Sequence, residues 1–138
     1  MAYSGYLVKV GGASSGYSIP LSFIKADSYK VTKLIQDLDS YRDTNGVLHR
    51  NALPHYAIKC EFECVPMLTN AEITTVVNAI EAKFSVAAER KATVAVYVPE
   101  TDSYVEQAMY MPDPEYQMYY ADSSMIQYSS VRFAFIGY

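Results

Sequence analysis

The fold is decided by the stretch Tyr56-Ala57-Ile58-Lys59-Cys60-Glu61-Phe62-Glu63-Cys64-Val65 and by the segment that continues from it to Phe84. Apolar and charged residues alternate along the first part, and successive side chains of a strand point to opposite faces. The pattern predicts a strand with one face in the core and the other in water. Pro66 cannot donate a hydrogen bond to a neighbouring strand, so we expect the strand to end there.

A helix is predicted directly after this strand. Thr69-Asn70-Ala71-Glu72 has the spacing of a capping box, with Thr69 as the N-cap, and Leu68 and Ile73 can close a hydrophobic staple around it. The apolar residues that follow recur at helical spacing: Ile73, Val76, Val77, Ile80 and Phe84. A helix of about residues 70–84 is only marginally stable alone, so we expect it to pack on the apolar face of the strand.

Strand patterns elsewhere make this a mainly β protein of the α+β class, and its 138 residues predict a single domain over 1–138. Further strands are expected at residues 6–10, 28–39, 92–98, 103–111, 116–121 and 126–138, and a loop at 13–18. Residues 92–98 are apolar on both faces, as a central strand would be, and 126–138 reads as one strand inside a sheet. Strands on both sides of a single helix predict a β-sandwich with one flanking helix, not alternating βαβ units.

Composition excludes several classes of protein. The formal net charge is −4, and no cluster of Lys and Arg marks a nucleic-acid-binding surface. No run approaches the roughly 20 apolar residues that cross a bilayer, so no membrane association is predicted. The first dozen or so residues are too polar for a signal peptide. We therefore expect a soluble protein that is made in a cytoplasm.

Residues that could carry chemistry are few. His49, His55, Cys60 and Cys64 lack the spacing of a metal site. The two cysteines lie about 13 Å apart along an intact strand, too far for a disulfide. Neither a nucleophile elbow nor a phosphate-binding loop is present. We predict no metal, no cofactor and no catalytic residue; an enzyme whose groups converge only in space is the third hypothesis.

The most informative irregular stretch surrounds Asp43-Thr44-Asn45-Gly46, because Asn-Gly tolerates the positive φ of a tight hairpin. We interpret residues 38–56 as a projecting β-hairpin arm, with an ordinary surface loop as the alternative. A two-stranded ribbon is marginal in water, so the arm is either mobile or held by a partner. The predicted contacts with that partner come from polar residues in an arm with few large apolar ones: Tyr41, Arg42, Asp43, Asn45, Gly46, His49 and Arg50.

Fourteen tyrosines and no tryptophan support a second, different hypothesis. Tyrosine combines an apolar ring with a polar tip and is enriched in binding interfaces. The stretch Tyr104–Tyr120 could therefore form an aromatic surface that binds a small molecule or a peptide. Tyrosines on half-exposed strands of a β-rich protein are the simpler explanation.

Several segments together resemble small tail proteins of long-tailed bacteriophages and prophages. They are Tyr6-Leu7-Val8-Lys9-Val10-Gly11-Gly12, the polar arm, the helix start at Leu68–Ile73, Ala108–Met111 and Val131–Ile136. The resemblance implies the tail-tube-like β-sandwich shared by tube proteins and by the first domain of distal tail (baseplate hub) proteins. Such proteins typically assemble as hexameric rings in which a long hairpin arm reaches a neighbouring subunit or ring.

The same resemblance implies a function, location and partners. The protein would be a structural, non-enzymatic component of the virion tail, assembled in the cytoplasm of the bacterial host. Its partners would be copies of itself and neighbouring tail proteins, with DNA only as cargo passing through the lumen. A net negative charge would suit a lumen to which DNA must not adhere. Tube, head-side terminator and distal ring all stay open.

Overall fold

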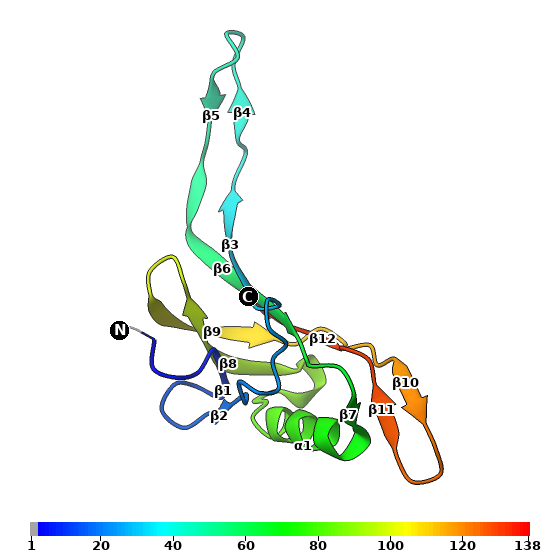
Figure 1. The fold of residues 1–138 in the computed structure, drawn as a ribbon. Helices are drawn as coiled ribbons and strands as arrows, with labels where there is room; N and C mark the ends of the chain where they lie inside the picture. The colour runs from blue at the N-terminus through cyan, green and yellow to red at the C-terminus, as the bar shows by residue number, and fades with distance from the viewer. Residues whose placement is uncertain (1–2) are drawn as a thin grey trace.

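The computed structural model describes residues 3–138, which form a mainly β structure with one α-helix, as predicted (Figure 1). The helix is α1 (Asn70–Glu81), and a short 3-10 turn, η1, spans Ala87–Glu89. The strands are β1 (Val8–Val10), β2 (Tyr17–Ser18), β3 (Lys30–Asp37), β4 (Tyr41–Arg42), β5 (Leu48–His49), β6 (Ala52–Glu63), β7 (Leu68–Thr69), β8 (Lys91–Val98), β9 (Ser103–Tyr110), β10 (Met118–Ala121), β11 (Ile126–Tyr128) and β12 (Arg132–Gly137).

Most of the strands join one seven-stranded antiparallel sheet in the order β2-β1-β8-β9-β12-β6-β3. β8 is flanked on both sides and is buried along most of its length, which confirms the predicted central strand. A second sheet has the order β10-β11-β7, and β4 pairs with β5 in the distal part of a long hairpin. The two small sheets extend from the main body in different directions (Figure 1).

The large sheet curls, so that its two halves enclose the core. Tyr29 lies just before the edge strand β3, yet its hydroxyl donates to the carbonyl of Tyr97 in β8 at 2.8 Å. The two layers expected of a sandwich are therefore halves of one sheet. Their inward side chains form a single cluster with residues of α1. It includes Val8, Ile58, Phe62, Val76, Ile80, Val94, Val96, Met109, Phe133 and Phe135.

The helix begins as predicted and ends earlier. Thr69 Oγ1 accepts a hydrogen bond from the Glu72 amide at 3.4 Å, and the Thr69 amide donates to the Glu72 carboxylate at 3.3 Å. The helix ends at Glu81, before Phe84, because the next residues tighten into bonds such as Phe84 N–H to Glu81 C=O. Phe84 nevertheless packs against the core from this turn.

Most strands are a residue or two shorter than predicted, and three segments differ more. The expected strand at 126–138 is two strands in different sheets, because Ser129 bonds to Gln117 of one segment and Val131 to Cys64 of another. The expected loop at 13–18 ends in β2, whose residues pair with β1. β6 starts at Ala52 rather than Tyr56, since the ribbon continues into the arm. Cys60 and Cys64 are free and buried, as their spacing predicts.

Removing the aromatic ring of Phe133 is expected to weaken the core. Its ring centroid lies 5.7 Å from that of Phe23 and 5.8 Å from that of Phe62. Phe133→Ala should lower the free energy of unfolding by about 3–5 kcal/mol, because a cavity replaces these contacts. Urea unfolding followed by circular dichroism measures this loss. Tyr119→Ala, at an exposed position, is the control and should stay within about 0.5 kcal/mol of the parent; equal losses would contradict the assignment of Phe133 to the core.

Candidate functional site

The hairpin predicted around Asn45-Gly46 is present as a long projecting ribbon, here called the arm and defined as residues 34–56 (Figure 1). At its tip the Asp43 amide donates to Val47 C=O at 3.0 Å, and the Gly46 amide donates to Asp43 C=O at 3.0 Å. Gly46 has φ +81°, a conformation that glycine adopts without strain. The arm is therefore an ordered two-stranded hairpin and not an irregular loop.

The polar residues predicted as partner contacts largely bond to one another. Arg50 forms a two-pronged ion pair with Asp37, with distances of 2.7 and 3.1 Å. His49 Nε2 lies 2.9 Å from Asp43 Oδ2, and its ring stacks on Tyr41 with centroids 4.9 Å apart. The guanidinium of Arg42 donates to Gly46 C=O at 2.9 Å. These contacts hold the ribbon in an extended shape.

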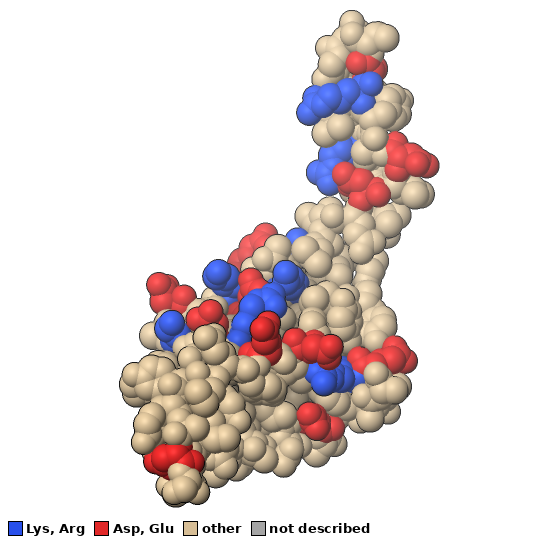
Figure 2. Space-filling view, turned by 90° about the vertical axis from the view of Figure 1, so that its right-hand side faces the viewer, with Lys and Arg blue, Asp and Glu red and all other residues tan. Residues whose placement is uncertain are grey.

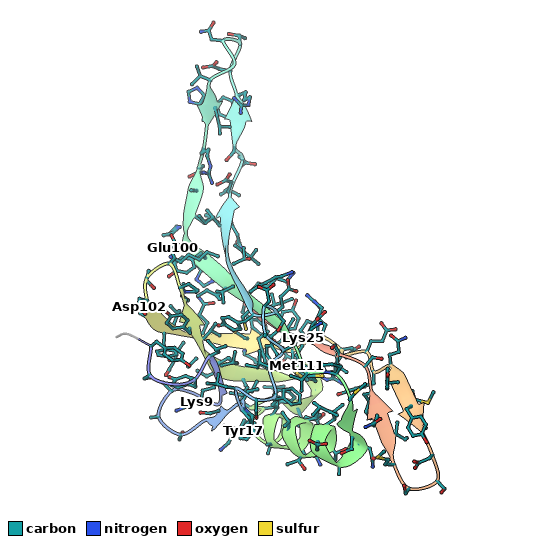
Figure 3. All side chains as sticks on the ribbon, viewed as in Figure 1. Lys9, Tyr17, Lys25, Glu100, Asp102 and Met111 are labelled. Atoms are coloured by element: carbon teal, nitrogen blue, oxygen red, sulfur yellow. The ribbon has the colours of Figure 1, made fainter. Side chains whose placement is uncertain are left out.

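Large apolar side chains are common on the arm, contrary to the sequence-based expectation of few. Ile35 is 63% exposed and Val47 is 54% exposed, although both are apolar. The side chains of this kind on the arm are Leu34, Ile35, Leu38, Val47, Leu48 and Leu53. Figure 3 shows that the distal part of the ribbon stands clear of the other described elements. A concentration of exposed apolar groups marks an interaction surface.

The root of the arm is fixed by a residue that sequence reasoning missed. Gln107 of β9 accepts from the Ile58 amide at 3.0 Å and donates to the Tyr56 carbonyl at 3.0 Å. β12 ends beside it at Gly137, where a Cβ atom would lie 2.6 Å from the Gln107 oxygen. The side-chain amide of Gln107 therefore makes the hydrogen bonds to β6 that a peptide group of a longer β12 would otherwise make. The sequence did contain a signal for this role: Gln107 is a polar residue between Val105 and Met109 on an otherwise apolar face of the strand.

An ion pair supports the same root. Lys33 Nζ lies 3.6 Å from the Glu100 carboxylate and 5.2 Å from the centre of the Tyr56 ring. Glu100 is at the tip of the β8–β9 connection, beside the start of the arm (Figure 3).

The proposed aromatic surface at Tyr104–Tyr120 is divided among separate clusters. Tyr104 stacks on Tyr6, and Tyr110 packs edge-on against Tyr138. Tyr116 packs edge-on against Tyr128, next to a groove of about 200 Å³ along α1. Beyond it the β10–β11 hairpin exposes four large side chains: Met118, Tyr119, Tyr120 and Ile126.

A groove of about 260 Å³ is lined by charged side chains that are mostly paired. Arg132 pairs with Glu61 and holds the pKa of that carboxyl below its usual range. Lys25 lies 3.6 Å from Glu63. The exposed face of β6 therefore carries ion pairs.

The residues considered for metal binding lie apart. His49 is on the distal arm, His55 Nε2 lies 2.8 Å from the Tyr138 carbonyl, and both cysteines are in the core. Burial raises the pKa of the Cys60 thiol to about 12. Within residues 3–138, no three His, Cys, Asp or Glu side chains gather as a metal site would require. Over the same residues, no helix is long and apolar enough to span a membrane.

The fold of this chain is similar to that of chains in gene transfer agent particles. A chain from the tail of an empty gene transfer agent particle with C6 symmetry superposes with a TM-score of 0.56 and 13% identity, covering 99% of this chain and 95% of that one. A chain from the native gene transfer agent virion gives a TM-score of 0.54 and 12% identity, with coverages of 97% and 91%. At these identities the likeness shows a shared fold.

The chain itself belongs to DUF6711, a family of unknown function whose sequence model matches residues 1–138. No curated protein matches it in sequence.

Acid is expected to loosen the arm tip. His49 and the Val47 and Asn45 amides hold the pKa of Asp43 below its usual range, and Arg50 does the same for Asp37. The ionised carboxylates stabilise the arm tip. This stabilisation is complete above the ordinary carboxyl pKa of about 3.9, and it is lost as the pH falls through the lowered pKa of the folded protein. The backbone amide signals of Asn45 and Val47, followed by NMR from about pH 5 downwards, should show the titration of the Asp43 carboxyl with a midpoint below about 3.9. In the Asp43→Asn variant this titration of the amide signals should vanish. A titration midpoint above the ordinary carboxyl pKa would contradict the hydrogen bonds assigned to Asp43.

Gln107→Leu is expected to free the root of the arm. The change leaves the Ile58 N–H and the Tyr56 C=O without partners, which should lower the free energy of unfolding by about 1–3 kcal/mol. Hydrogen exchange at the Ile58 amide should accelerate. Gln127→Leu is a matched control, because Gln127 is a partly exposed residue of β11 in the separate three-stranded sheet. Unchanged exchange at Ile58 would show that Gln107 does not hold the root.

Proposed function

We propose that this protein is a structural subunit of a phage-like tail that assembles with copies of itself and with neighbouring tail proteins. The observation that supports this most is the shared fold with chains of gene transfer agent tail and virion particles. The superposition spans almost the entire length of both chains in each case. A catalytic role, a cofactor and a membrane are not part of the proposal.

The arm supports assembly through a second line of argument. A monomer gains nothing by holding six large apolar side chains in water on an extended ribbon, whereas a neighbour could bury them. The ribbon is already shaped by its own ion pairs and turn, so docking would order few additional residues. In this proposal the apolar residues supply most of the contact area. The polar residues shape the ribbon and line the rim of the contact: Tyr41, Arg42, Asp43, Asn45, Gly46, His49 and Arg50.

The form of the assembly follows the same proposal. The gene transfer agent tail used for comparison has C6 symmetry, and we propose a hexameric ring in the tail tube or at its distal end. The formal net charge of −4 suits a lumen through which DNA passes as cargo without adhering. The protein would be located in the virion tail after assembly in the host bacterial cytoplasm.

Shortening the arm tests this function. Leu38 N–H donates to Asn51 C=O at 2.8 Å, so replacing residues 39–50 by Asn-Gly should close a short hairpin at that pair. The variant should keep its circular dichroism spectrum and remain monomeric at concentrations where the parent forms rings or tubes. Light scattering and electron microscopy of negatively stained particles provide the measurement.

Leu21→Ser is the control for this experiment, because Leu21 is an exposed apolar residue outside the arm. It should assemble as the parent does. Assembly of the shortened variant at the parental concentration would refute the role of the arm. A parent that remains monomeric throughout would refute self-assembly itself.

A further inference from the structure

Two exposed apolar surfaces lie at opposite ends of the molecule (Figure 1). The first is the distal arm, defined here by Tyr41, Arg42, Val47 and Leu48. The second is the hairpin surface, defined by Met118, Tyr119, Tyr120, Asp122 and Ile126. Met118 is 59% exposed and Tyr119 is 56% exposed, values close to the 54% of Val47. Since they stand so far apart, one copy of the chain cannot cover its own hairpin surface with its own distal arm.

The hairpin surface also has a free backbone edge. β10 is an outer strand of its three-stranded sheet, and all four of its residues are exposed. Neither Lys, Arg nor Pro occurs in β10, although natural edge strands usually carry such residues to block pairing. Figure 2 views the molecule from this side and shows a lobe at the lower left that is almost free of charged atoms. An edge and a surface of this kind are suited to contact with another chain.

One unpaired charge stands on each surface, and the two have opposite signs. Arg42 has no ion-pair partner in residues 3–138, while the other arginine of the arm, Arg50, is paired with Asp37. Asp122 is the only charged residue between Tyr116 and Tyr128. It accepts hydrogen bonds from Ser124 and Met125, and no cation within the described chain pairs with it. These bonds keep the pKa of Asp122 below its usual range, so it is ionised at neutral pH.

We propose that the distal arm of one copy docks on the hairpin surface of a second copy, with Arg42 facing Asp122 and Val47 and Leu48 packing on Met118 and Tyr119. This inference rests on the proposed self-assembly and names the surface that receives the arm. The contact joins two different patches, so each copy offers one arm and one receiving hairpin. Repetition of such a contact closes a ring or continues as a filament.

Charge reversal tests the contact in the full-length chain. Arg42→Asp and Asp122→Arg should each raise the concentration needed for assembly by about tenfold, because an attractive pair becomes repulsive in a partly desolvated contact. Combining both reversals restores opposite charges and should return the value to within about threefold of the parent. Glu115→Arg is a matched control, since Glu115 is an exposed acid outside the hairpin; it should assemble like the parent.

The outcomes separate this contact from the proposed function. If the parent assembles but the double reversal is no better than the weaker single variant, the pairing of Arg42 with Asp122 is refuted and self-assembly stands. If Glu115→Arg is as weak as Asp122→Arg, net charge explains the effect and the contact is refuted. If the parent never assembles, self-assembly fails and this contact fails with it.

A second measurement leaves both charges in place. Copies carrying Val47→Cys are mixed with copies carrying Tyr119→Cys and treated with a short bismaleimide, which should join one copy of each kind. The natural Cys60 and Cys64 are buried and should not react. Thr101→Cys, at the exposed β8–β9 turn, replaces Tyr119→Cys as the control and should give no product with Val47→Cys. Equal yields from Thr101→Cys and Tyr119→Cys would overturn the proposed contact.

Discussion

The continuous pairing of β3 with β6 is the constraint on which the rest of this structure depends. Val31 pairs with Cys60 at the core, and the ladder continues through Ile35 and Tyr56. After a register shift it reaches Asp37 and Ala52, where the ribbon has left the core. Beyond that point both faces of the ribbon are in water, so an apolar side chain has nothing to pack against within the same chain. The arm keeps its shape through hydrogen bonds and ion pairs instead. Its apolar side chains stay exposed within the described chain, which is why we propose that the arm takes part in assembly.

The direction of the arm is set where the ribbon leaves the body. The curl of the large sheet brings Tyr29 against β8, and this closes the core below the ribbon. Gln107 then bonds to two peptide groups of β6 immediately beyond the end of β12, next to Gly137. These contacts make the arm a continuation of the folded body and not a tethered loop. An arm that already has this extended shape loses less conformational entropy on docking than an unstructured loop would, which favours a stable contact with a partner.

The fold shared with gene transfer agent chains and the exposed apolar surfaces of this chain support the proposed function in different ways. The likeness to gene transfer agent chains covers nearly the whole molecule at 12–13% identity, so backbone architecture is similar although most side chains differ. The exposed apolar residues of the arm and of the β10–β11 hairpin are observed directly in the structure of this chain. Together they connect a tail-like fold to specific surfaces through which copies could join.

Features that depend on a few neighbouring residues could be predicted from the sequence. The alternation at Tyr56–Val65, the capping box of Thr69 and Glu72 and the Asn45-Gly46 turn each act locally, and all three are present. Tertiary structure alone decided the break at Ser129–Val131, the curl of the sheet and the role of Gln107, since each depends on a segment distant in sequence. It also decided that Ile35 and Leu48 are exposed while Ile58 is buried. The physical reason is that periodicity specifies which side chains share a face, whereas burial depends on what the rest of the chain places opposite that face.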